Sequence, residues 1–414
     1  MQGIEKTIKI LHTIGGIWQD AGGPAESVPS LCGALAEGGQ EVTLACWEGN
    51  LSEATKVCQE KGVRLKTYPV QWRHSIWYSR EMSVGVKELI KQSEIVHGQG
   101  VWIHLNWITG KWARRYDKGL MISPRGALMP NALNRSYLKK RLAWAIMDKR
   151  NLRRADCLHA CSEKELQGLR KLGLTNPVAV IPNGVEVPQG IAERSCAKYN
   201  GTKKLLFLSR LHPSKGVFEL IEAWARLAER LPEWRLIMAG ADYHNTRARL
   251  EVVIKEKKLS DSVRLVGAVY GDEKWRLLRE ADLFVLPTKT ENFGIAIGEA
   301  LASGVAVVTS KEAPWRGIEE NDCGWRVPLG VDYLKEALEE AMSTEHTKLK
   351  EMGQRGKVYI SQNYSWGRVA EKMLETYKWM LGGGAAPVWV EGQKSTAKKI
   401  VCLQGCKNLV PTGE

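Results

Sequence analysis

The sequence predicts an α/β protein with two doubly wound, Rossmann-like domains that face each other across a cleft. Strand-like apolar runs alternate with helix-length periodic segments along the chain, which is typical of parallel sheets covered by helices on both faces. The chain has 414 residues, whereas a single hydrophobic core stops growing at about 250 to 300 residues. A segment rich in Gly, Pro and charge at 186–203 interrupts the alternation. We therefore expect domains at 1–185 and 204–363, joined by that linker.

The apolar runs give the expected strands in order. They are 6–14, 40–47, 93–99, 118–126, 156–162 and 177–184 in the first domain, and 203–210, 234–240, 263–269, 282–288 and 304–310 in the second. In such sheets, ligands bind beyond the carboxyl ends of the strands, so functional residues are expected in the loops that follow them. Residues 364–381 have helical periodicity, and residues 382–414 are expected to form a flexible tail.

Composition excludes a membrane-spanning protein, because no apolar stretch approaches the roughly 20 residues that a spanning helix needs. The first residues resemble a strand rather than a signal peptide, so we expect a cytoplasmic protein. The net charge is +14, and the segment 111–154 holds 13 basic but only two acidic residues. Within it, 134–154 predicts a basic helix with Tyr137 and Trp144. This helix has two alternative interpretations. It docks peripherally on anionic lipid, or it packs on the core and its basic face is solvated.

Metal sites are not indicated by the sequence. The nine cysteines are mostly isolated, and neither close pair is completed by a second Cys or His pair. The chain also has no Asp-x-Asp pair, so a carboxylate site for a divalent metal–nucleotide complex is missing. We expect no metal and no tightly bound cofactor.

Two carboxylates frame a strand-to-helix junction in ENFGIAIGEALASG, where Glu291 lies in the loop and Glu299 about one turn into the helix. The start of that helix presents free backbone amides, which favour an anion such as a diphosphate. Because a carboxylate repels phosphate, the two acids are interpreted as acceptors for hydroxyl groups on either side of it. One acid near the helix dipole and one solvated acid is the alternative.

A basic loop follows another strand in SRLHPSKG, which places Arg210 and Lys215 five residues apart. Such cations can neutralise a diphosphate leaving group and take the place of a metal. Near the N-terminus, Gly22 and Gly23 come directly before a helix, where glycine lets backbone approach a ligand. A basic surface loop and a tight turn are the plain alternatives.

Two further strand ends in the first domain carry candidates, His97 in HGQGVW and Arg125 in SPRGAL. Either would face the cleft and contact a reacting sugar or phosphate. For His97 a purely structural role is the alternative, as it is for most single histidines after a strand.

Taken together, these segments resemble the family 4 retaining glycosyltransferases of GT-B fold, which transfer a sugar from a nucleotide-sugar donor. The likeness runs from about residue 7 to 381. It rests on AGGPAESV, HGQGVW, SPRGAL, ACSEKE, IPNGV, SRLHPSKG and ENFGIAIGEALASGVAVV, in that order.

The resemblance implies roles for the candidates. Glu291 would contact the donor sugar, Glu299 the ribose, and Arg210 with Lys215 the diphosphate. The donor cleft would further be lined by Gly22, Gly23, Asn292, Phe293 and Gly294. It also implies that the final helix, 364–381, crosses back onto the first domain. Where many members carry His, this chain has Arg125, which cannot act as a base and would instead hold a phosphate or sugar oxygen.

The function expected from the sequence is a metal-independent, retaining hexosyl transfer in cell-surface polysaccharide biosynthesis. The donor would be a UDP- or GDP-sugar, and the acceptor a glycan or a polyprenyl-diphosphate-linked glycan. An epimerase or phosphorylase of GT-B fold is the nearest alternative. A basic, non-catalytic protein that binds nucleic acid or membrane would not explain the four strand-end residues together, and no stacking motif for nucleic acid is present.

Overall fold

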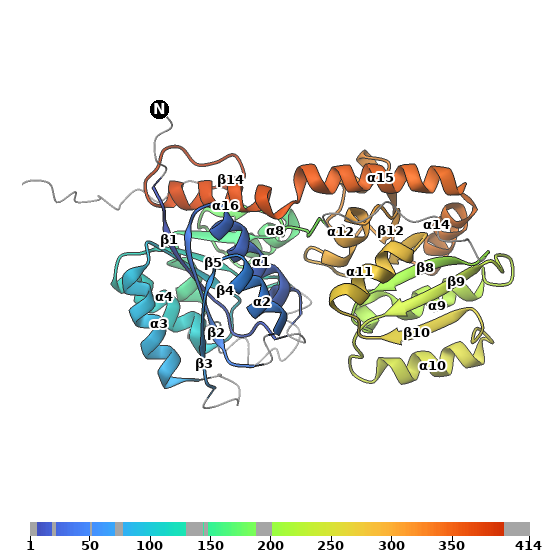
Figure 1. Ribbon diagram of the computed structural model, residues 1–414, viewed down its shortest axis with the longest axis horizontal. Coiled ribbons are helices and arrows are strands. Elements are labelled where there is room, and N and C mark those ends of the chain that lie inside the picture. Colours follow the sequence, from blue (N-terminus) through green and yellow to red (C-terminus); the bar gives the residue numbers. More distant parts are fainter. Residues whose placement is uncertain are drawn as a thin grey trace, which may run out of the picture.

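The computed structural model describes residues 6–18, 22–49, 52–70, 78–129, 144, 148–187 and 201–392. Two lobes lie side by side, and each is built on its own sheet (Figure 1). The prediction of two Rossmann-like domains is confirmed. Most of the linker expected at 186–203 lies outside the described residues, and so does most of the basic helix expected at 134–154.

The first sheet has the strand order β14-β7-β6-β5-β4-β1-β2-β3, and all of its pairs are parallel except β14 with β7. Its strands are β1 (Lys9–Thr13), β2 (Glu41–Trp47), β3 (Arg64–Tyr68), β4 (Ile95–Gln99), β5 (Gly119–Ser123), β6 (Cys157–Ala160), β7 (Val178–Val180) and β14 (Val390–Glu391). Its helices are α1 (Gly23–Glu37), α2 (Ser52–Glu60), α3 (Arg80–Gln92), α4 (His104–Arg115), α7 (Lys149–Arg153) and α8 (Glu163–Lys171).

The second sheet is parallel throughout, in the order β10-β9-β8-β11-β12-β13. Its strands are β8 (Lys203–Leu208), β9 (Trp234–Ala239), β10 (Val263–Gly267), β11 (Leu283–Leu286), β12 (Val307–Ser310) and β13 (Gly324–Val327). Its helices are η3 (Pro213–Lys215), α9 (Val217–Ala225), α10 (Thr246–Glu256), α11 (Gly271–Glu280), α12 (Ile295–Ala302), α13 (Gly317–Glu320), α14 (Val331–Ser343) and α15 (His346–Asn363).

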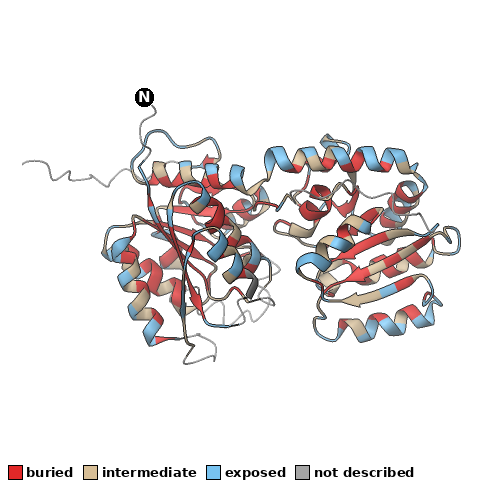
Figure 2. Ribbon diagram, viewed as in Figure 1, coloured by how far each residue is buried: buried red, intermediate tan, exposed pale blue. Residues whose placement is uncertain are grey.

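The strand order reverses direction once in each sheet, between β1 and β4 in the first and between β8 and β11 in the second. In open α/β sheets the crevice at this reversal is where ligands bind. Buried residues concentrate in the central strands of both sheets and on parts of the surrounding helices (Figure 2). The topology therefore marks two crevices, one in each domain.

The final helix α16 (Trp366–Met380) follows α15 and packs on α1 of the first domain (Figure 1). The chain thus passes between the domains twice. At these crossings Val185 and Ser365 form a β-bridge, and the Val185 amide donates to the Tyr364 carbonyl at 2.7 Å. The bond ties one crossing to the other.

The expectation of a flexible tail from residue 382 is wrong up to Glu391. Val390 and Glu391 add an antiparallel strand to β7, and the Trp389 indole donates to Thr376 of α16 at 3.0 Å. The Gly-rich composition concealed an edge strand of two residues. Among the described residues, no helix is both long and apolar enough to cross a membrane.

Candidate active site

The crevice of the second sheet is formed by the loops that follow β8 and β11. These loops are tied together, because the Lys289 amide donates to the Ser214 carbonyl at 2.8 Å. Gly216 has a φ of 74° and passes so close to β11 that a Cβ there would lie 2.1 Å from the Pro287 oxygen. Only glycine fits both conditions. The close approach brings Lys215 to the loop that carries Glu291.

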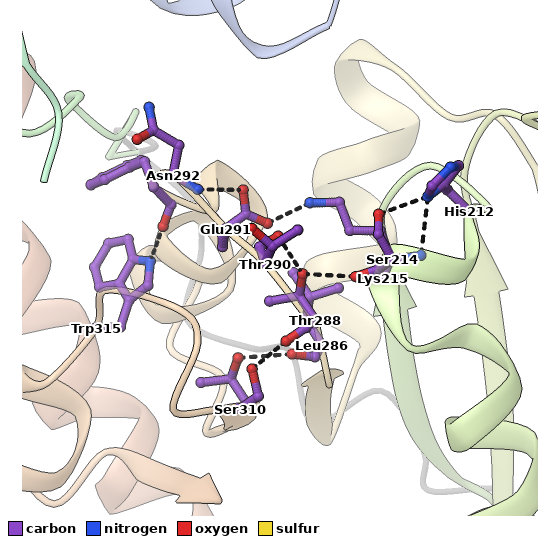
Figure 3. A network of polar contacts seen from close by, with 12 residues as sticks. His212, Ser214, Lys215, Leu286, Thr288, Thr290, Glu291, Asn292, Ser310 and Trp315 are labelled. Atoms are coloured by element: carbon purple, nitrogen blue, oxygen red, sulfur yellow. Dashed lines mark hydrogen bonds and ion pairs between the residues drawn. The ribbon is translucent and has the colours of Figure 1, made fainter. Parts of the chain in front are cut away.

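Lys215 and Glu291 form an ion pair, with 2.5 Å between Nζ and Oε2 (Figure 3). Their side chains are only 12% and 14% exposed. The structure thus brings together two predicted site residues 76 positions apart. Behind them, Ser310 and Trp315 bond to the carbonyls of Thr288 and Phe293, which holds the loop onto the second domain.

Arg210 lies on the same loop as Lys215, between β8 and η3. It is exposed, and its guanidinium carbon lies 5.6 Å from the centroid of the Tyr243 ring. Within the described part of the chain, no ion pair or hydrogen bond joins it to Lys215 or Glu291.

Helices from both domains begin at this crevice. Helix α12 starts after Gly294 and α1 after Gly22, and neither start is capped by a side chain. A Cβ on Gly23 would lie 3.5 Å from Cδ1 of Ile295, so the two helix starts face each other. Uncapped helix starts present free amides and the positive end of a dipole. Both predicted glycines therefore lie where an anion would be stabilised from two sides.

Glu299 lies on α12 and is 5% exposed. The ammonium of Lys274 is 2.7 Å from its carboxylate, and Glu26 of α1 lies 3.5 Å from the same ammonium. Burial raises the pKa of Glu299, against the effect of Lys274. These side chains line an interdomain cavity of about 240 Å³ together with Tyr270 and Trp275.

The crevice of the first sheet holds Arg125, in a cavity of about 250 Å³ that is also lined by Trp18, Trp47 and Gln99. Arg125 has a φ of 56°, unusual for a side-chain-bearing residue. Its Nε donates to Gln99 at 2.8 Å and its Nη1 to Asn183 at 2.6 Å. Its buried Nη2 has no hydrogen-bond partner in the described protein.

The loop of Arg125 faces the loop of Glu291. A Cβ on Gly126 would lie 3.2 Å from the Asn292 side chain, and the buried Oδ1 of Asn292 has no partner among the described residues. On the first domain the Gly126 amide donates to Glu165 at 2.5 Å, which fixes the loop. Unpartnered polar atoms thus occur on both sides of the cleft.

The expectation that His97 faces the cleft is wrong. Its side chain is completely buried, and both ring nitrogens are bonded, to Tyr377 at 2.7 Å and to Ser123 at 2.6 Å. Burial holds its pKa well below the usual range. The strand β4 ends two residues later, so the residue that reaches the cleft is Gln99.

Sequence reasoning missed Gln99, Asn183 and Lys274. Gln99 and Asn183 lie inside motifs quoted above, but nothing in the sequence tells that they bond to Arg125. Lys274 is one of several charges on an amphipathic helix, and only its ion pair with Glu299 of α12 distinguishes it. Among the described residues, no cluster of three or more His, Cys, Asp or Glu side chains forms a metal site.

Comparisons with known families cover both domains. The family described as Glycosyl transferase 4-like domain matches residues 22–184, and Glycosyl transferases group 1 matches residues 191–359.

Two curated relatives and one solved structure give the level of similarity. The GDP-mannose:cellobiosyl-diphosphopolyprenol alpha-mannosyltransferase of Xanthomonas campestris is 23% identical over 71% of this chain and 76% of its own. A phosphatidyl-myo-inositol mannosyltransferase of Mycobacterium tuberculosis is 31% identical over 50% of this chain and 55% of its own. HepE from Anabaena, solved with UDP and glucose, superposes with a TM-score of 0.72 at 17% identity, over 90% of this chain and 100% of its own. The chain belongs to the family 4 glycosyltransferases of GT-B fold.

Proposed function

We propose that the protein transfers a hexose, with retention of configuration, from a UDP- or GDP-sugar to a glycan or lipid-linked acceptor in polysaccharide biosynthesis. The observation that carries the donor site is the meeting of two uncapped helix starts beside Lys215. A diphosphate there would accept bonds from the amides of α1 and α12 and from the Lys215 ammonium. Such groups stabilise the charge that builds on the leaving group as the glycosidic bond breaks.

The two carboxylates would take the hydroxyl groups of the donor. When Lys215 turns to the diphosphate, Glu291 becomes free to accept from the sugar, and Glu299 would accept from the ribose. A diphosphate leaving group needs no separate acid. Retention without a placed nucleophile fits attack from the same face, in which the departing phosphate oxygen takes the acceptor proton.

The acceptor would enter from the first domain. Arg125 and the half-buried Trp18 both line the cavity of the first domain, which suits a phosphate or an anionic sugar next to a ring that stacks on an indole. The relatives named for diphosphopolyprenol and phosphatidylinositol acceptors support a lipid-linked acceptor of this kind. A peripheral position at the inner face of the cell membrane would follow, with segment 111–154 as its basic contact.

A thermal-shift screen of nucleotide sugars with EDTA present tests the donor site. A donor at 100 times its dissociation constant adds about 2.7 kcal/mol to the free energy of unfolding. We expect a shift with GDP-mannose or UDP-glucose, unchanged by added Mg²⁺. A full panel without any shift would contradict the proposal, and conversion of the bound sugar without acceptor would indicate an epimerase instead.

A further inference from the structure

Buried polar side chains link four neighbouring strands of the first sheet. His12 on β1, His97 on β4, Ser123 on β5 and His159 on β6 are each at most 2% exposed. The fifth member, Tyr377, comes from α16 and is completely buried. None of these side chains lines either cavity described above.

The side chains form one continuous path from Arg125 to a backbone carbonyl, here named the Arg125–Ile181 chain. Its bonds are Arg125 Nε to Gln99 Oε1 at 2.8 Å, Gln99 Nε2 to His12 Nδ1 at 3.1 Å, His12 Nε2 to Tyr377 Oη at 3.4 Å, Tyr377 Oη to His97 Nδ1 at 2.7 Å, His97 Nε2 to Ser123 Oγ at 2.6 Å, Ser123 Oγ to His159 Nδ1 at 2.6 Å, and His159 Nε2 to Ile181 O at 2.7 Å.

The two ends fix the direction of every bond. A guanidinium only donates and a carbonyl only accepts. A neutral histidine, a hydroxyl or an amide edge can accept on one side and donate on the other. Assigning donor and acceptor roles from Arg125 or from the Ile181 carbonyl gives the same result. Each member accepts a hydrogen bond from the Arg125 side and donates one towards Ile181. All three histidines must therefore carry their proton on Nε2.

The histidines are neutral, as this direction requires. Burial, helped by the Arg125 charge, lowers the pKa of His12 and of His159 to about 3. A protonated imidazole donates from both nitrogens and would break the chain. At neutral pH the bond pattern is therefore a single, ordered one.

We propose that Tyr377 is a positioning residue for Arg125. Its hydroxyl accepts from Nε2 of His12, which keeps Nδ1 of His12 unprotonated and facing the Gln99 amide. Without the hydroxyl, His12 can carry its proton on Nδ1, and Gln99 must then turn its oxygen to His12. The amide nitrogen of Gln99 would then face the guanidinium, so that two donors meet and Nε of Arg125 loses its acceptor.

The proposal also makes α16 part of the reaction machinery. This helix follows α15 of the sugar-binding domain, and its Tyr377 acts through His12 and Gln99 on Arg125 in the acceptor domain. It rests on the proposed function only in that Arg125 contacts substrate there. The position of Arg125 itself can be measured without any substrate.

Tyr377→Phe is the test variant, and Thr376→Val is its matched control. Thr376 is equally buried on the same helix. Its hydroxyl bonds to Lys372 and Trp389, which are not members of the Arg125–Ile181 chain. Nitrogen-15 NMR of histidine- and arginine-labelled protein reports tautomers and the exchange of the Arg125 Nε proton with water.

In the wild type and in Thr376→Val we expect three Nε2-protonated buried histidines from pH 6 to 8. In Tyr377→Phe we expect His12 to show the Nδ1-protonated form, and the Arg125 Nε proton to exchange at least about tenfold faster, as for a lost hydrogen bond. Unchanged His12 and Arg125 signals in Tyr377→Phe, or equal changes in the control, would overturn the proposal.

A double-mutant cycle with Arg125→Met tests the kinetic consequence. Tyr377→Phe should lower kcat/KM for the acceptor about five- to thirtyfold, the effect of one lost bond, and should have no further effect when Arg125 is already replaced. The same loss in both backgrounds would show a merely structural role. If the wild type transfers no sugar, the proposed function fails, whereas the NMR comparison still decides the role of Tyr377.

Discussion

Lys215 and Glu291 neutralise each other across the two loops of the second-domain crevice, at 2.5 Å and with little exposure. Each is a group that a nucleotide sugar would engage separately, the cation through its diphosphate and the carboxylate through a sugar hydroxyl. Under the proposed function, the pair would separate when the donor binds, and its two charges would act on either side of the scissile bond.

Replacing Lys215 by Met should lower kcat by about 10² to 10³, because one donor to the leaving-group charge is lost. Glu291→Gln should lower kcat/KM less, since an amide oxygen still accepts a hydroxyl bond. Steady-state rates with the donor found by the thermal-shift screen provide the measurement. Lys289→Met is the control, because Lys289 lies on the neighbouring loop that carries Glu291 but pairs with Glu219, and its side chain is 45% exposed. Equal losses in Lys289→Met and Lys215→Met would contradict the assignment.

Buried neutral histidines also make stability depend on pH. The folded-state pKa values of His12 and His159 are about 3, against 6.5 for the ordinary group. Below pH 6.5 the unfolded chain binds more protons than the folded one, so stability is present above that pH and is lost on acidification.

We expect each such histidine to lower the free energy of unfolding by up to about 1.4 kcal/mol per pH unit between pH 6 and 4. Urea unfolding at several pH values measures this slope. His159→Gln removes one titrating group and should reduce the slope by the contribution of one histidine, up to about 1.4 kcal/mol per pH unit. An unchanged slope would show that His159 does not remain neutral in the folded protein.

At the scale of elements, β14 is held by Trp389 as well as by its ladder to β7. The Trp389 indole donates to Thr376, and Lys372 lies 5.6 Å from the centroid of its ring. The neighbouring Val388 is 96% exposed. Because Trp389 makes these contacts and the adjacent Val388 is exposed, Val388 is a suitable control position for substitutions at Trp389.

Trp389→Ala should destabilise the first domain by about 2 kcal/mol, since a half-buried indole and its hydrogen bond are lost. Val388→Ala should leave the thermal midpoint unchanged. Thermal denaturation followed by circular dichroism checks both variants, and equal midpoints for them would mean that β14 contributes nothing to stability.

The elements that sequence predicted well are those with a strong local signal. Apolar strands such as β11 and the strand–turn–helix junction at Gly294 were predicted because burial and glycine chemistry act within a few residues. β3, β13 and β14 escaped, since they are short or partly exposed and depend on pairing with distant strands.

In the candidate site, too, local features could be predicted from the sequence, whereas contacts between distant segments could not. Glu291 and Lys215 were predicted as functional from their loops, but their direct ion pair depends on the contact of Gly216 with Pro287. The burial of His97 could not be predicted, because it is α16, 280 residues later, that covers it.

For the whole molecule, the decisive contact is that of the two helix starts at Gly23 and Ile295. Gly23→Ile would place a branched side chain where a Cβ alone already lies 3.5 Å from Ile295. We expect the domains to be held apart, with at least a tenfold lower kcat/KM and a larger radius of gyration in X-ray scattering. Gly367→Ala, where a Cβ meets nothing within 4 Å, is the control. An unchanged radius and rate for Gly23→Ile would show that the helix starts need not approach.

The bond between Val185 and Tyr364 has a mechanical consequence. Because the two chain crossings are bonded to each other, they define a single hinge axis between the domains. Rotation about that line leaves the bridge intact, whereas sliding or twisting one domain past the other would break it. We therefore expect a single soft degree of freedom, hinge bending, by which the cleft opens to admit substrates and closes in the same register on every cycle.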